Sequence, residues 1–227
     1  MELYDVMRTA FSAREFTDDR VPDEVLFTIL DNARFASSGG NRQGWRVIVI
    51  RDAATKAALA DLQIPAIKRY MSQVQAGENP FNTIDQTTLD AATIERTPVP
   101  PRTIDAIARA PVVLVVGVDL KVVASVDYAL PRVGVISGAS IYPFVWNLLL
   151  AARNEGYGGT LTTWAVAAEP AVQSLLSIPS HVAIAAVIPF GRPASHRTKL
   201  NRRPVAAFTF LERWDGVPLM NPSATTS

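Results

Sequence analysis

Residues 147–160 read N-L-L-L-A-A-R-N-E-G-Y-G-G-T, an apolar run that ends in a cluster of glycines. The run from Leu148 to Ala152 would be apolar on nearly every side of a helix. Such a helix belongs in the middle of a core or in a large subunit interface. The run closes the longest helical pattern of the chain, over residues 133–154, which Pro143 interrupts. We therefore expect a helix at the centre of the fold.

Apolar strands precede and follow this helix. Residues 45–50, 112–118 and 182–190 read as buried strands, and residues 207–211 are strand-like. The second of these is apolar throughout, the pattern of a strand covered on both faces. We also expect helices over residues 2–9, 53–62 and 168–178, the second of them capped by Asp52. A fourth helix is expected to begin at Pro22. Along the chain, helices come first and are followed by strands with helices between them, an order that favours a mixed α/β or α+β layer architecture.

Two segments differ from the rest of the domain, which we place at residues 1–216. Residues 63–104 are the least regular part of the chain and are rich in proline. Long irregular segments inside compact domains are often lids or binding loops, so we expect a lid that contains some helix. Residues 217–227, rich in proline, serine and threonine, are expected to form a flexible tail.

The composition excludes several classes of protein. The 227 residues carry a net charge of +1, which argues against nucleic-acid and membrane partners. The sequence has no cysteine and only two histidines, so thiolate chemistry, disulfides and a metal site are not expected. No serine lies in a nucleophile elbow, which leaves a hydrolase without support. The chain has no recognisable signal peptide or membrane span, so we expect a cytoplasmic protein.

Charged residues make up only 19% of the chain, while 48% are hydrophobic. In soluble domains, charged residues usually make up about a quarter of the chain. This balance favours an apolar surface that a partner covers, most simply a second copy of the chain.

Four polar clusters could bind a ligand. Ser12 and Arg14, two residues apart after the first helix, can both point at one anion, although Arg14 would serve equally well in a surface ion pair. The loop at residues 37–45, S-S-G-G-N-R-Q-G-W, offers paired donors and acceptors, but loops are commonly built from such residues. The glycines at residues 156–159 follow a helix, whereas the glycines of the Rossmann and P-loop patterns follow a strand, so both patterns are excluded. The backbone N–H groups of this segment could instead face a flat ring. Lys199, Arg202 and Arg203 are either a solvated segment or the completion of a phosphate site.

Together these segments resemble the nitroreductase family in the same order along the chain. The family's R-x-S-x-R/K pattern and following aromatic residue are matched by Ser12, Arg14 and Phe16, and its P-D-E-V-L helix start by residues 22–26. Its P-S-S-x-N-x-Q-P-W loop is matched at residues 37–45, and its N-L-L-L-A-A helix end with the following glycines at residues 147–160. Its closing G-x-P and basic-basic-Pro segments are matched at residues 191–193 and 202–204.

The resemblance implies an α+β fold, a three-layer α/β/α sandwich with a central, mainly antiparallel sheet, assembled as a homodimer. It implies FMN sites at the subunit interface, each built from both chains, and transfer of electrons from NAD(P)H to a small electron-poor acceptor such as a nitroaromatic or a quinone. No dedicated acid or base residue is implied.

The resemblance also implies roles for individual residues. Ser12, Arg14 and Arg202, with Arg203 beside them, would hold the phosphate and ribityl chain, and the backbone of Gly158–Thr160 would face the ring. Asn41 and Gln43 would read the polar edge of the ring. The implied cofactor-binding residues are Ser12, Arg14, Ser37, Ser38, Asn41, Gln43, Gly158, Gly159, Thr160, Arg202 and Arg203.

The chain departs from the family pattern at three positions. Ala10 stands where the family usually has a basic residue, and Ala36 and Gly44 replace prolines. Arg8, in the preceding helical turn, is a candidate to replace the missing charge. Three alternatives stay open: a flavin-binding or cofactor-poor protein with a sequestering or regulatory role, flavin-dependent dehydrogenation or dehalogenation, and destruction of the flavin itself.

Overall fold

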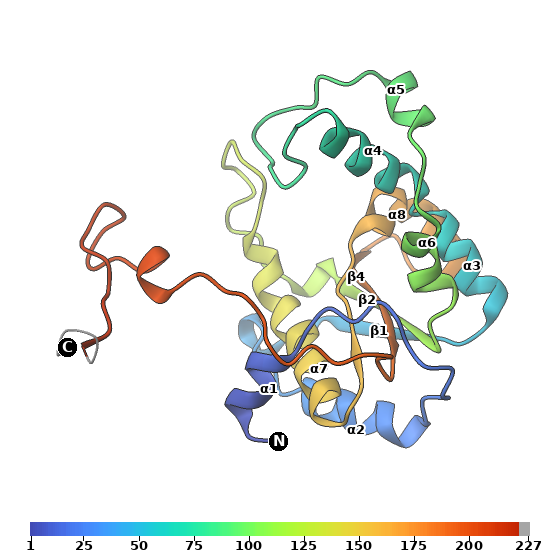
Figure 1. Ribbon diagram of the computed structural model, residues 1–227, viewed down its shortest axis with the longest axis horizontal. Helices are drawn as coiled ribbons and strands as arrows, with labels where there is room; N and C mark the ends of the chain where they lie inside the picture. The colour runs from blue at the N-terminus through green and yellow to red at the C-terminus, as the bar shows by residue number, and fades with distance from the viewer. Residues whose placement is uncertain (223–227) are drawn as a thin grey trace.

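The computed structural model describes residues 1–222 (Figure 1). In chain order its α-helices are α1 (Leu3–Thr9), α2 (Asp23–Ala33), α3 (Ala53–Asp61), α4 (Ile64–Gln75), α5 (Ala91–Arg96), α6 (Pro101–Ala108), α7 (Tyr142–Asn154) and α8 (Glu169–Leu176). The strands are β1 (Trp45–Ile50), β2 (Val112–Asp119), β3 (Gly158–Gly159) and β4 (Val182–Gly191).

The strands of the described chain form one antiparallel sheet in the order β1-β2-β4-β3. Strand β1 pairs with β2 from Trp45 opposite Val118 to Ile50 opposite Val113. Strand β4 pairs with the other edge of β2, and the register shifts between Val116 and Gly117. The central position of β2 explains why its sequence is apolar at nearly every residue.

The two faces of β2 belong to two different cores. Leu114 and Val116 pack in a cluster with residues of α2 and α7. Val113 and Val115 point to the other face and pack with residues of α3, α6 and α8. Successive side chains of a strand alternate between faces, so one continuous apolar strand supplies both cores. The sheet therefore lies between two helical layers, which confirms the predicted α+β sandwich with an antiparallel sheet.

Local sequence signals set most element boundaries. Asp52 caps α3 as predicted, because its carboxylate accepts a hydrogen bond from the N–H of Thr55 at 2.7 Å. The helix predicted from residue 133 begins only at Tyr142, with Pro143 in the first turn of α7. Proline has no N–H to give to a preceding turn, so residues 136–140 form a separate 3-10 helix instead.

The strand predicted over residues 207–211 is wrong. Residues Val205–Ala207 form a short 3-10 helix, and only Phe210 makes an isolated bridge, to Pro218. This part of the chain lies in an arm that leaves the body after β4 and extends away from it (Figure 1). The arm has no sheet edge to join, so its β-branched and aromatic residues have no strand to pair with. Trp214 is 91% exposed there.

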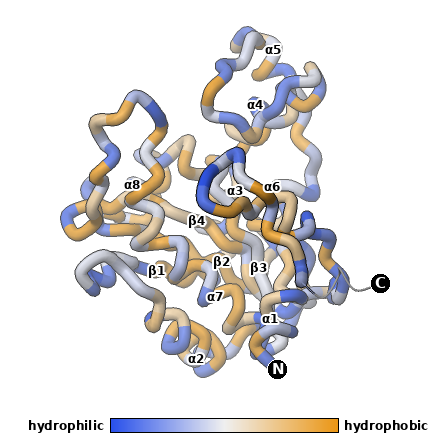
Figure 2. The backbone as a smooth tube through the Cα atoms, turned by 90° about the vertical axis from the view of Figure 1, so that its left-hand side faces the viewer, coloured by the Kyte–Doolittle hydropathy of each residue, from blue (hydrophilic) through white to orange (hydrophobic). Residues whose placement is uncertain are grey.

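The predicted lid and tail both lie at the periphery of the molecule. Helices α4 and α5 of the predicted lid project from the body in both views (Figures 1 and 2). Residues 217–219 of the predicted tail return to the arm, where Leu211 N donates to Val217 O at 2.9 Å and Leu219 N donates to Thr209 O at 3.0 Å. The last five residues, 223–227, lie outside the described part of the chain. Among residues 1–222, no helix is long and apolar enough to cross a membrane.

Both residues of strand β3 are glycines, because the strand packs too closely on its surroundings to leave room for side chains. A Cβ atom on Gly159 would lie 2.7 Å from the carbonyl oxygen of Pro189 and 2.8 Å from Cγ2 of Ile188. On Gly158 it would lie 3.1 Å from Cγ of Pro193. The absence of side chains therefore lets the end of α7 return directly onto β4.

We predict that Gly159→Ala lowers the free energy of unfolding by about 1–3 kcal/mol, the usual cost of overpacking a core. Urea denaturation measures the change. Gly134→Ala is the matched control, because a Cβ atom there would lie 3.7 Å from its nearest neighbour, the Asp127 carboxylate. Equal stability of the two variants would contradict the packing argument.

Candidate functional site

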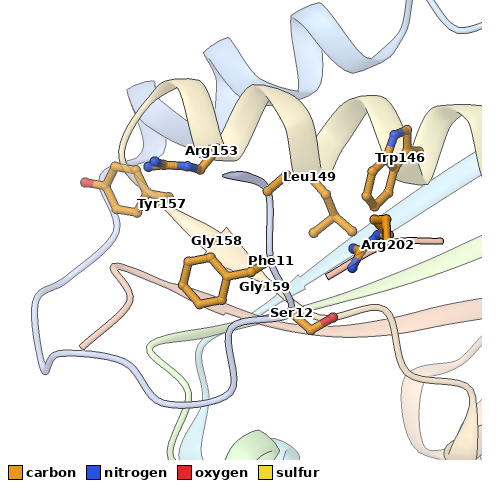
Figure 3. A pocket seen from close by; sticks show the side chains of 10 residues that line it. Phe11, Ser12, Trp146, Leu149, Arg153, Tyr157, Gly158, Gly159 and Arg202 are labelled. Atoms are coloured by element: carbon orange, nitrogen blue, oxygen red, sulfur yellow. The ribbon is translucent and has the colours of Figure 1, made fainter. Parts of the chain in front are cut away.

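A small cavity lies between the segment that follows α1, one side of α7 and strand β3 (Figure 3). Its volume is about 150 Å³. Leu149 points into it from α7, and Phe11 and Tyr157 add aromatic surface (Figure 3). The lining residues are Ala10, Phe11, Ser12, Trp146, Leu149, Arg153, Tyr157, Gly158, Gly159 and Arg202.

Backbone hydrogen bonds hold Ser12 at this cavity. Helix α1 ends where Ala10 N donates to Val6 O at 2.9 Å. The chain then runs beside β3, with Ser12 and Gly159 forming a parallel bridge and Ala13 N donating to Gly159 O at 3.1 Å. The Ser12 side chain is exposed, so its hydroxyl is available to a ligand.

Two arginines give the cavity its charge. Arg153 lies in the last turn of α7, and its Nε donates to Thr9 Oγ1 at 3.0 Å. Arg202 comes from the segment after β4, and its Nη1 donates to the carbonyl of Asn201. No carboxylate is among the cavity's lining residues in the described chain. Guanidinium groups and a hydroxyl are donors that bind phosphate oxygens, so this arrangement suits an anion beside an apolar wall.

The loop at residues 37–43 lies toward the other end of α7. Gly39 N donates to Ser140 Oγ at 3.1 Å, two residues before α7 begins. Trp45, which follows the loop, stacks on Phe144 of α7 with 4.9 Å between ring centroids. Helix α7 has 13 residues, which makes it about 20 Å long. The candidate residues Ser37, Ser38, Asn41 and Gln43 therefore do not line the cavity of their own chain.

The backbone of this loop is strained at two of the candidate residues. Asn41 and Gln43 have φ values of 53° and 50°, in the left-handed region that side chains disfavour. Gln43 N donates to Ser38 Oγ at 2.9 Å, and Gln43 Nε2 donates to Asn41 Oδ1 at 3.1 Å. Strain of this kind persists where the surroundings enforce it, and it gathers at functional sites. Both amide side chains are exposed and face solvent in a single chain.

The other candidate residues lie outside the cavity lining. Arg14 does not form a carboxylate ion pair in the described chain, and its Nη1 donates to Ser12 O at 3.3 Å. Thr160 is buried directly after β3. Arg203 lines a separate, open hollow of about 670 Å³ in the arm, together with Phe208 and Trp214. The structure thus joins Ser12, Gly158, Gly159 and Arg202 at one cavity.

The nitroreductase family model matches residues 7–192. The chain belongs to the nitroreductase family. The match contains the cavity residues from Ala10 to Gly159 and ends where the arm begins, so Arg202 lies beyond it.

Known proteins agree with this assignment. A Thermus thermophilus protein named NADH dehydrogenase is 29% identical over 204 residues, which cover 84% of this chain and 89% of that protein. A solved iodotyrosine deiodinase bound to FMN and 3-iodo-L-tyrosine superposes with a TM-score of 0.66 at 22% identity, covering 90% of this chain and 96% of the other. A BluB-like flavoprotein from Clostridium difficile gives a TM-score of 0.68 at 18% identity, covering 94% and 100%. The likeness to the two structures concerns the fold.

Six residues that line this nitroreductase cavity were not among the predicted site residues, and two of them, Trp146 and Arg153, lie on α7 together with Leu149. Their spacing with Leu149 is i, i+3, i+7, which places all three on one side of α7. That periodicity was a usable signal once the helix was placed. Arg153 has no distinct signal in the sequence, since a basic residue in a last helical turn is commonly explained by the helix dipole. Arg8, the residue suggested as a replacement for the missing charge, lies over the ring of Tyr4 instead and does not line the cavity.

The described residues contain no candidate metal site, because no three or more histidine, aspartate or glutamate side chains lie close enough together to hold an ion.

A buried carboxylate holds the segment that leads into α7. Asp127 accepts hydrogen bonds from Val135 N and from Arg132 Nη1, each at 2.8 Å. The Val135 N–H and then the Arg132 guanidinium lower the pKa of Asp127 to about 2, from an ordinary value of 3.8. Ser140, which contacts the loop at residues 37–43, follows in the same segment.

We predict that residues 127–136 loosen as the pH falls from 3.8 to about 2. The folded pKa is the lower one, so the stabilisation is complete above 3.8 and is lost as Asp127 binds a proton. Hydrogen exchange of the Val135 amide, relative to the unfolded-chain rate at each pH, measures the loss. Asp127→Ala, which removes the acceptor, should expose this amide at every pH, and equal protection of the amide in this variant and in the wild type would contradict the account.

Proposed function

We propose that this chain is an FMN-dependent oxidoreductase that passes electrons from NAD(P)H to a small electron-poor acceptor. The observation that carries the proposal is the cavity, which is lined by a hydroxyl and two guanidinium groups as well as by apolar walls. These donors suit the phosphate of a flat aromatic cofactor, and the cavity lies in a nitroreductase-family chain. When bound, FMN supplies the hydride and electron chemistry.

The protein's contribution is position and charge. Ser12 and Arg202 hold the phosphate, and Arg14, which contacts the carbonyl of Ser12, lies beside them. The backbone of Gly158–Thr160 lies against the ring. The donor and the acceptor bind in turn over the same open face, which gives ping-pong kinetics without a dedicated acid or base residue.

The size of the cavity argues that one chain holds only part of the cofactor. Pockets that enclose a whole ligand usually have volumes of about 300–1,000 Å³, whereas this cavity has about 150 Å³. The exposed amides of Asn41 and Gln43, whose backbone is strained, lie outside this cavity, where a second chain can reach them. We therefore propose a homodimer in which Ser37, Ser38, Asn41 and Gln43 of one chain complete the ring site of the other.

Exposed aromatic residues support a dimer interface centred on α7. Tyr142 and Trp146, one helical turn apart on α7, are 42% and 46% exposed. The extended arm presents Phe208, Trp214 and Val217 to solvent. Apolar patches of this kind mark protein interfaces. A second copy covers both features in the proposed assembly.

The lid borders the same region. Tyr70 of α4 contacts Trp164, five residues after Gly159, with 5.0 Å between ring centroids. Glu78 holds the turn after α4 by accepting hydrogen bonds from the Thr87 hydroxyl and from Thr88, which lowers its pKa to about 2. We propose that residues 63–104 shape the space over the ring and select the acceptor.

We predict that sedimentation equilibrium gives twice the chain mass of 24.6 kDa. Trp146→Glu should shift the protein toward a single chain, because a carboxylate would be buried without a partner. Phe27→Glu is the control, since Phe27 is 72% exposed but lies on α2. A wild-type protein at the mass of one chain would contradict the dimer.

The test of function is the visible spectrum of the purified protein, repeated after NADH or NADPH is added without oxygen. An oxidised-flavin spectrum that bleaches is the expected result. A flavin spectrum that does not bleach would favour a sequestering or regulatory protein. A protein that binds no added FMN would overturn the proposed function, and halide release from a halogenated aromatic would instead identify dehalogenation.

We predict that Ser12→Ala weakens FMN binding by about 10–100-fold, the effect of losing one hydrogen bond to a charged group. Quenching of flavin fluorescence measures the change. Ser180→Ala is the control, because Ser180 is an exposed turn residue before β4. FMN affinity that is equal in the two variants would place the phosphate elsewhere.

A further inference from the structure

The cavity lacks one cation that the family pattern leads us to expect. Ala10 is 8% exposed and lines the cavity, where it offers only a methyl group. The hydroxyl of Ser12 and the guanidinium of Arg202 alone would leave a phosphate dianion partly uncompensated.

Arg153 lies beside this gap. Its Nε donates to the hydroxyl of Thr9, the immediate neighbour of Ala10, at 3.0 Å. That hydroxyl in turn donates to the Asp5 carbonyl at 2.6 Å. This chain of hydrogen bonds ties the guanidinium of Arg153 to the end of α1, beside Ala10. Figure 3 shows Arg153 beside the cavity, across from Ser12 and Arg202.

The remaining donors of Arg153 have no acceptor in the part of the chain that the structure describes. Within residues 1–222, neither Nη1 nor Nη2 of Arg153 makes a hydrogen bond, and the side chain belongs to none of the ion pairs. Arg153 is nevertheless partly buried. Removing a guanidinium from water costs free energy unless another group compensates it. A forked cation with free Nη groups at a cavity suits a bidentate oxyanion.

We propose that Arg153 binds the cofactor phosphate and replaces the cation that Ala10 cannot supply. The phosphate site then consists of Ser12, Arg153 and Arg202, taken from three separate segments of the chain. This inference rests on the proposed function, in which the ligand is FMN. It makes Arg153 a determinant of selectivity for FMN over riboflavin, which has the same ring but no phosphate.

The test compares the dissociation constants of FMN and riboflavin, measured by fluorescence quenching on the apoprotein. Arg153→Gln should weaken FMN binding by about 10–100-fold, the loss expected for charge-assisted hydrogen bonds. Riboflavin binding should not change, because riboflavin has no group for Arg153 to contact. Arg109→Gln is the matched control, since Arg109 is 81% exposed and pairs with Asp105 on α6.

The outcomes separate this inference from the function itself. An unchanged ratio of FMN to riboflavin affinity in Arg153→Gln would overturn the role of Arg153 while leaving FMN binding intact. An equal loss of both affinities would overturn it too, because a purely structural role affects both ligands. A wild-type protein that binds neither flavin would refute the proposed function.

A second variant keeps the test decisive if Arg153→Gln does not fold. Arg153→Lys retains the charge, so it should preserve most of the FMN selectivity, and FMN binding to this variant should weaken as salt rises. Riboflavin binding should be insensitive to salt. Arg153→Lys with no preference for FMN would overturn the proposal.

Discussion

The parallel bridge between Ser12 and Gly159 joins the segment after α1 to the edge of the sheet, and the cavity depends on it. Gly159 can reach this edge only because it has no side chain to collide with Pro189 and Ile188. The same close approach places the end of α7, with Arg153, at the same cavity as Ala10 and Ser12. A packing requirement in the core thus determines which polar groups meet at the surface.

Much of the fold could be predicted because its signals are local. The apolar run of β2 indicated a strand covered on both faces, and the Asp52 cap follows from the chemistry of helix ends. Pro143, expected to interrupt a longer helix, lies in the first turn of α7 instead. Residues 207–211 misled the prediction because β-branched and aromatic residues favour strands only where a partner strand exists. Whether a partner strand is present depends on the tertiary structure, and in the arm Phe210 has only an isolated bridge to Pro218.

The site was predictable in part. Ser12, Gly158, Gly159 and Arg202 were candidates from motif order, and the structure brings them to one cavity. Arg153 could not be recognised from motifs, since its role depends on how α7 packs against α1. Asn41 and Gln43, by contrast, were candidates from motif order, but in a single chain they are exposed in strained conformations and do not line the cavity. The contacts proposed for them belong to an assembly of two chains.

The central claim is that a cluster of cations at one cavity binds the phosphate of FMN as a dianion. Phosphorus NMR of the protein with bound FMN, recorded between pH 5 and pH 8, tests it most directly. A free phosphate monoester binds a proton with a pKa of about 6, so its resonance moves across this range. We expect a displaced resonance that stays constant, because the guanidinium groups stabilise the dianion. A bound resonance that titrates like that of free FMN would contradict the claim.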